Sequence, residues 1–99
     1  MNVVGGLRIG ETAVDLPALL AIVSSFRDKA CSERLVSFGE IGLAGEIRPV
    51  RFGEERIAAA AKQGFTRALV PHANMPKKTP KGIEVVGIKR VRDALDEAF

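Results

Sequence analysis

The strongest folding signal in this chain is the stretch Phe38-Gly39-Glu40-Ile41-Gly42-Leu43-Ala44-Gly45-Glu46-Ile47-Arg48-Pro49-Val50. Glycines at a spacing of three interrupt an alternation of apolar and acidic residues. Because glycine tolerates positive φ and close backbone approach, this pattern predicts two short strands joined by a tight turn. A helix that opens with Gly53-Glu54-Glu55-Arg56 is predicted to follow at once.

Three elements are predicted before this hairpin. Residues 1–9 have the composition of a strand interrupted by a pair of glycines. Apolar residues recur at intervals of three and four over residues 14–26, which predicts a helix with a wide buried face. Thr12 and Asp15 at its start resemble a capping box. A strand at residues 35–38 then leads into the hairpin.

After the hairpin the sequence predicts a helix over residues 54–62 with Gly64 as its C-terminal cap, and then a strand over 65–70 that Pro71 stops. An exposed loop over 72–82 and a strand over 83–88 are predicted to follow. A last helix is marked by Val91, Leu95 and Phe99. Such alternation favours a sheet with helices packed on it, so the predicted fold class is α/β. At 99 residues the chain can build one hydrophobic core, and we expect a single domain over residues 1–99.

The charge of the chain is positive and unevenly distributed. The formal net charge is +3. From Lys77 to Arg92, Glu84 is the only carboxylate among six basic residues. This pattern indicates either a basic face for nucleic acid or cations that solubilise a loop and a helix end, and the charge alone leaves both interpretations open.

Few residues suit catalysis or metal binding. The single Cys31 excludes an internal disulfide, and no Cys-x-x-Cys pair is present to bind zinc. His72, the only histidine, follows Pro71 in a predicted loop, so we interpret it as solvated. Glu40 and Glu46 are interpreted as cross-strand or solvent-facing groups rather than an acid and base pair. No apolar run approaches the ~20 residues that a membrane span needs, and we expect a cytoplasmic protein.

The hairpin and the helix after it resemble the core of the Lon-type peptidase domain. The resemblance implies an α/β sandwich of the ribosomal protein S5 domain 2-like type. Lon-type peptidases use a serine nucleophile at the start of one helix and a lysine general base on a second helix. Aligning the motifs places Ala13 at the serine position and Arg56 at the lysine position. Alanine has no nucleophile and arginine keeps its proton, so the resemblance predicts a degenerate site without catalytic residues.

Almost the whole chain resembles the C-terminal Lon-like domain of the RadA (Sms) family of bacterial DNA repair proteins. The motifs that carry this resemblance are Asn2-Val3-Val4-Gly5-Gly6-Leu7, Glu11-Thr12-Ala13-Val14-Asp15-Leu16, Ser24-Ser25-Phe26-Arg27-Asp28, the hairpin itself, Glu54-Glu55-Arg56, Pro71-His72-Ala73-Asn74 and Pro76-Lys77-Lys78. The resemblance implies a non-catalytic domain that helps assemble a hexameric ring and contacts DNA. In such proteins a DNA-dependent ATPase core drives branch migration during recombinational repair.

The resemblance also sets expectations for cofactors and partners. No cofactor is expected in this chain, while ATP, magnesium and a zinc finger belong to other parts of such a protein. The expected partners are single-stranded or branched DNA, further copies of the protein and a recombinase filament, with no membrane. Because Lon-like domains begin further upstream with a helix and strands, we read the chain as the latter part of such a domain. We therefore expect an exposed apolar face or an open sheet edge.

The residues expected to contact DNA are the cations in and after the hairpin and in the basic stretch, namely Arg48, Arg51, Arg56, Lys77, Lys78, Lys81, Lys89 and Arg90. Contacts to phosphate position DNA without reading its sequence. For Arg51 and Arg56, surface ion pairs with Glu54 or Glu55 are an equal alternative. Two other functions are carried as alternatives, an active Ser/Thr-Lys peptidase that uses Thr12 and a ribosomal-type RNA-binding module. Thr12 is disfavoured as a nucleophile because one residue along a helix turns the side chain by about 100°.

Overall fold

The computed structural model of this protein describes residues 12–30 and 34–99. Its helices are α1 (Asp15–Arg27), α2 (Gly53–Lys62) and α3 (Val91–Ala98), with the short 3-10 turns η2 (Thr12–Val14) and η3 (His72–Asn74). Its strands are β1 (Leu35–Ser37), β2 (Glu40–Ile41), β3 (Ile47–Arg48), β4 (Arg67–Pro71) and β5 (Glu84–Ile88). The strand predicted over residues 1–9 and the single Cys31 lie outside the described residues.

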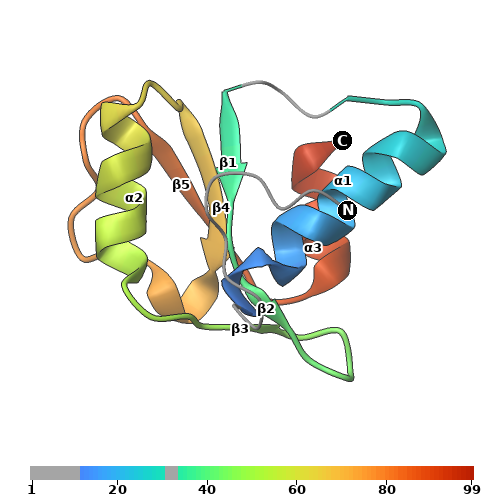
Figure 1. Ribbon diagram of the computed structural model, residues 1–99. Helices are drawn as coiled ribbons and strands as arrows, with labels where there is room; N and C mark the ends of the chain where they lie inside the picture. The colour runs from blue at the N-terminus through green and yellow to red at the C-terminus, as the bar shows by residue number, and fades with distance from the viewer. Residues whose placement is uncertain (1–11, 31–33) are drawn as a thin grey trace.

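A parallel sheet forms the middle layer of the fold. Its strand order is β1-β4-β5, and both neighbours of the central strand β4 run parallel to it. Helix α2 covers one face of the sheet, while α1 and α3 cover the other (Figure 1). The predicted α/β class is therefore confirmed for the described part of the chain.

Two apolar clusters fill the space between the sheet and its helices. The cluster under α1 and α3 contains Leu16, Leu20, Ile47, Leu69, Ile88 and Ala94. The cluster under α2 contains Phe38, Ile57, Ala60, Ala68, Val70 and Ile83. Because successive side chains of a strand point to opposite faces, Leu69 enters the first cluster while Ala68 and Val70 enter the second. All three are 0% exposed, so β4 is shared by both clusters.

The predicted elements agree with the structure to within one or two residues at each end. The predicted cap of α2 is confirmed, since Gly64 has a φ of +93°. The Gly64 N–H donates to the Ala61 carbonyl at 3.2 Å, and the Phe65 N–H donates to the Ala60 carbonyl at 3.1 Å. This pair of bonds is the Schellman arrangement, which satisfies carbonyls that the helix leaves without partners.

One local prediction is wrong, and another is displaced by one residue. Helix α1 has no capping box: its N-cap is Val14, with no side-chain cap hydrogen bond, and the Asp15 carboxylate accepts a hydrogen bond from the Ile41 N–H at 3.1 Å. The Asp15 carboxylate therefore binds a backbone N–H of the hairpin instead of the N–H at the start of its own helix that a capping box requires. Pro71 does end β4, but it is itself the last residue of the strand, in register with Ile88, rather than the first residue after it. A missing N–H is tolerated where the ladder ends, and the Pro71 φ of −55° and ψ of 137° suit an extended chain.

The glycine-rich hairpin forms as predicted. Glu40 pairs with Arg48 and Ile41 with Ile47 in an antiparallel ladder. Gly45 has a φ of +81° in the turn between the strands. The hairpin is also hydrogen-bonded to the residue that follows β5, because the Ile47 N–H donates to the Lys89 carbonyl at 2.9 Å.

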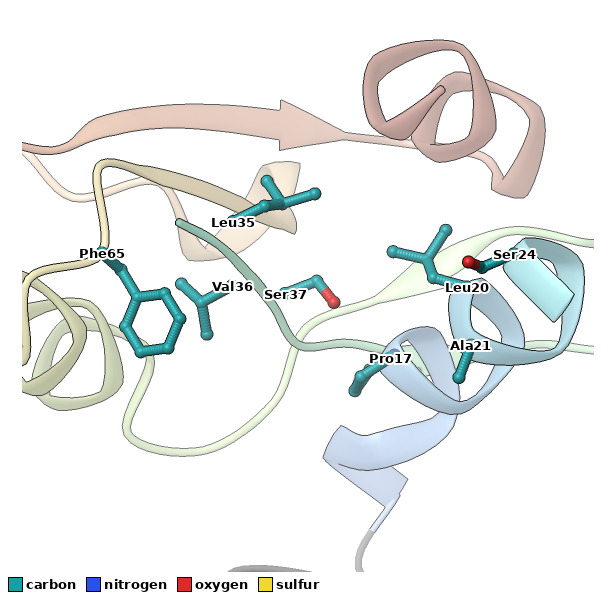
Figure 2. A pocket seen from close by; sticks show the side chains of 8 residues that line it. All are labelled: Pro17, Leu20, Ala21, Ser24, Leu35, Val36, Ser37 and Phe65. Atoms are coloured by element: carbon teal, nitrogen blue, oxygen red, sulfur yellow. The ribbon is translucent and has the colours of Figure 1, made fainter. Parts of the chain in front are cut away.

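Apolar surface is exposed along α1, as the sequence led us to expect. Ile22 is 66% exposed and Phe26 is 91% exposed. A groove of about 340 Å³ lies between α1 and β1, which is an outer strand of the sheet among the described residues (Figure 2). Its lining residues are Pro17, Leu20, Ala21, Ser24, Leu35, Val36, Ser37 and Phe65.

Candidate nucleic-acid interface

The two positions aligned with a peptidase dyad lie at the end of β1. Ala13 is 4% exposed, and its carbonyl accepts a hydrogen bond from the Gly39 N–H at 2.9 Å. The guanidinium carbon of Arg56 lies 5.9 Å from the ring centroid of Phe38. Since Phe38 and Gly39 are consecutive, the fold brings both positions to one neighbourhood. A methyl group and a guanidinium supply neither a nucleophile nor a general base there.

The carboxyl end of the sheet gathers one group of the candidate cations. Because β1, β4 and β5 are parallel, their carboxyl ends meet at one edge, the lower edge in Figure 1. The hairpin, η3 and the start of α2 lie at this edge. Arg48, Arg51 and Arg56 come from the hairpin, the loop after it and the first turns of α2. Lys89 and Arg90 directly follow β5 at the same edge.

The remaining candidates lie apart from this edge. Lys77, Lys78 and Lys81 belong to the loop that leads from η3 back to the opposite end of the sheet, where β5 begins. The sequence predicted one basic stretch, and the parallel pairing of β4 with β5 divides it between two ends of the sheet.

A side-chain clamp fixes the loop before α2. Asn74 of η3 accepts a hydrogen bond from the Val50 N–H at 2.8 Å, and its amide nitrogen donates to the Val50 carbonyl at 3.0 Å. A Cβ at Gly53 would lie 2.7 Å from that amide nitrogen, so the clamp also requires glycine at position 53. This clamp is not visible in the sequence, because an asparagine in a loop gives no signal of a partner 24 residues away.

The hairpin carboxylates neutralise one of the candidate cations. Arg48 forms an ion pair at 3.9 Å with Glu40, its partner across the hairpin ladder, so the predicted cross-strand role is confirmed for Glu40. Its ion pair at 3.0 Å is with Glu46, which lies two residues away along the same segment rather than across the ladder. Hydrogen bonds from its own N–H, from the Arg48 guanidinium and from the Ala44 N–H hold the pKa of Glu46 below its ordinary value of 4.5. Arg48 is therefore the candidate least available to an external phosphate.

The basic stretch keeps its charge exposed. Lys77, Lys78, Lys81, Lys89 and Arg90 are exposed, and no ion pair involves them within residues 12–30 and 34–99. The only carboxylate of the stretch, Glu84, instead binds Arg67 at 3.1 Å. Arg67 is held by Glu97 as well. The stretch is thus more cationic in the fold than its sequence suggests.

The two arginines beside α2 differ in their contacts. Arg51 is exposed and has no ion pair among the residues that the structure describes. Arg56 is half-buried, and its Nε donates to the Arg51 carbonyl at 2.9 Å. This bond fixes the backbone of the loop in which Arg51 lies, so Arg56 has a structural role there.

Other candidate chemistry is not assembled in the described part of the chain. His72 is exposed on η3, as expected for a solvated loop histidine. No group of three or more His, Cys, Asp or Glu residues there is arranged to hold a metal ion. None of the helices that the structure describes has the length and apolar character of a membrane span.

Comparisons with known proteins identify relatives of this chain. The family model described as "Subunit ChlI of Mg-chelatase" matches residues 4–74. DNA repair protein RadA of Escherichia coli (strain K12) is 59% identical over 95 residues, which cover 96% of this chain and 21% of that protein. DNA repair protein RadA of Bacillus subtilis (strain 168) is 45% identical over 96 residues, which cover 96% of this chain and 21% of that protein. The chain therefore spans about a fifth of the length of these relatives.

Proposed function

We propose a function for this chain from the premise that it belongs to the family described as subunit ChlI of Mg-chelatase. Its similarity to DNA repair protein RadA supports a more specific assignment. In that assignment, residues 1–99 form one partial Lon protease-like domain of the ribosomal protein S5 domain 2-like type. The domain is non-catalytic, helps assemble a ring-shaped repair ATPase and contacts DNA independently of sequence.

The observation that carries the non-catalytic role is the pair of side chains at the aligned dyad positions. Ala13 is buried and has no hydroxyl, and the Arg56 guanidinium is bound to a backbone carbonyl and lies near the Phe38 ring. Peptide hydrolysis by a Ser-Lys dyad needs a hydroxyl beside an unprotonated amine. These two side chains cannot provide that pair.

Exposed cations support the contact with DNA. Neutralising phosphates with lysine and arginine releases counterions, which supplies affinity without sequence preference. Lys77, Lys78, Lys81, Lys89 and Arg90 are exposed, and Glu84, the only carboxylate between Lys77 and Arg92, is bound to Arg67. The ATP, magnesium and zinc that we associate with such a protein belong to the parts of it outside this chain. We place the protein in the cytoplasm, with DNA, its own copies and a recombinase filament as partners.

Salt-dependent DNA binding tests this proposal. We expect the 99-residue chain to bind a fluorescent oligonucleotide with similar affinity for two unrelated sequences. The double variant Lys77→Glu/Lys78→Glu is expected to lower the slope of log affinity against log salt by about 2, since each duplex phosphate contact contributes about 0.9. The control Lys29→Glu/Lys62→Glu makes the same change in net charge at exposed positions outside this loop and is expected to keep the slope. Equal slopes for both variants would refute the assigned surface.

Two assays separate the alternative functions. A peptidase hydrolyses unfolded casein and loses that activity in Thr12→Ala, whereas we expect no hydrolysis by the unaltered chain. A ribosomal-type RNA-binding module prefers structured RNA over duplex DNA, whereas we expect no such preference. Casein turnover, or a strong preference for structured RNA, would replace the proposed function.

A further inference from the structure

Phe52 combines an unusual backbone conformation with a largely exposed aromatic side chain. Phe52 has a φ of 61° and a ψ of 35°, and its side chain is 64% exposed. Among the described residues, Asp28 is the other non-glycine residue with positive φ. A short polar side chain is tolerated in this left-handed region, whereas a bulky one is strained there. Strain of this kind persists only where the surrounding structure enforces it.

The residues on both sides of Phe52 enforce its conformation. Asn74 binds the N–H and the carbonyl of Val50. The Nε of Arg56 binds the Arg51 carbonyl at 2.9 Å, and the Arg56 N–H binds the Phe52 carbonyl at 2.9 Å. The ring of Phe52 is therefore held toward solvent by a backbone that is fixed before, at and after it.

Folding stability does not account for this residue. A glycine at position 52 would remove the left-handed strain, and the mostly exposed ring contributes little burial. A rigidly presented aromatic face instead suits a ligand with a flat apolar face of its own. Bases of single-stranded nucleic acid are such ligands, because they stack on exposed aromatic side chains without regard to sequence.

The charges around Phe52 favour a base rather than a phosphate against the ring. The exposed carboxylates of Glu54 and Glu55 follow in the first turn of α2 and repel phosphate. The exposed Arg51 precedes the ring and attracts phosphate. A single strand can avoid the carboxylates and still bind the arginine if it places a phosphate beside Arg51 and turns a base toward the ring.

We propose that Phe52 is a stacking platform for an unpaired nucleobase, with Arg51 contacting an adjacent phosphate. The inference rests on the proposed function, because it names the contact by which the chain distinguishes single-stranded from duplex DNA. Duplex bases are already stacked on one another, so this contact is available only to a single strand.

The chain contains no tryptophan, which provides a direct test. In Phe52→Trp the new indole is the only tryptophan, and stacking against a base is expected to quench its fluorescence. Titration with oligothymidylate is expected to quench the indole, and titration with duplex DNA is expected to leave it bright. Quenching of equal depth by both ligands would overturn the proposal.

A second variant measures the affinity that the ring contributes. Phe52→Gly suits the left-handed backbone, and circular dichroism checks that it stays folded. It is expected to weaken oligothymidylate binding by about 5-fold to 100-fold, as for the loss of one stacked base, and to leave duplex binding unchanged. Unchanged oligothymidylate binding refutes the stacking role and leaves the DNA contact intact. If the unaltered chain binds neither ligand at low salt, the proposed function itself fails.

Discussion

Replacing Asn74 by alanine tests whether one side chain fixes the loop that leads into α2. The change removes two hydrogen bonds to Val50, at 2.8 and 3.0 Å, both partly buried. Each such bond contributes about 1 kcal/mol net, so we expect Asn74→Ala to lower the free energy of unfolding by about 2 kcal/mol. For a domain of this size that loss corresponds to a decrease in Tm of about 8–16 °C.

A graded series makes the prediction specific. At pH 7 Asn74→Asp keeps an acceptor for the Val50 N–H but sets a carboxylate oxygen against the Val50 carbonyl oxygen in place of the donor, so it is expected to cost at least as much as Asn74→Ala. The matched control Thr79→Ala, at an exposed position of the loop after η3, is expected to change stability by less than about 0.5 kcal/mol. Thermal unfolding followed by circular dichroism measures all three. Asn74→Ala behaving like Thr79→Ala, or Asn74→Asp keeping the stability of the unaltered chain, would contradict the role assigned to these two bonds.

Three further predictions concern the strained residue, the core and the hairpin. Phe52→Gly is expected to keep or raise the free energy of unfolding, whereas Phe52→Val is expected to lower it by about 1 kcal/mol because β-branched residues fit the left-handed region poorly. Denaturant unfolding compares the two variants, and a loss above about 1 kcal/mol for Phe52→Gly contradicts the assigned strain. Leu69→Ala is expected to cost about 2–5 kcal/mol in the same assay, since Leu69 is 0% exposed, and a loss below about 1 kcal/mol would disprove its place in the core. The folded-state pKa of Glu46 is lowered, so its stabilisation is present above the ordinary value of 4.5 and is lost as the pH falls through the folded pKa. The stability difference between the unaltered chain and Glu46→Gln should therefore shrink on acidification from pH 7, and a difference that grows would reverse the assigned sign.

The sequence predicts the elements of this fold well because their signals are local. The glycine spacing marks the hairpin, and apolar residues at intervals of three and four mark α1. The cap at Gly64 is predictable because it depends on bonds within the same turn. The failed capping box at Asp15 shows the limit, since its carboxylate binds Ile41, 26 residues away.

The candidate site is less predictable than the fold. The residue types that suit phosphate contact are visible in the sequence, but their grouping depends on the parallel order β1-β4-β5, which separates Lys77 from Lys89. The pairing of Glu84 with Arg67 joins two adjacent strands and becomes visible only when those strands are placed side by side. The positive φ of Phe52 is likewise set by contacts of its neighbours rather than by its own residue type.

The central position of β4 determines how this small protein comes apart. Its side chains alternate between the two apolar clusters, so neither helical layer can detach without exposing a face of the same strand to water. Melting should consequently be all-or-none, with no partly opened species that keeps only α2 or only α1 in place. Backbone amides of β4 should be the last to exchange with deuterated solvent, at rates governed by global opening.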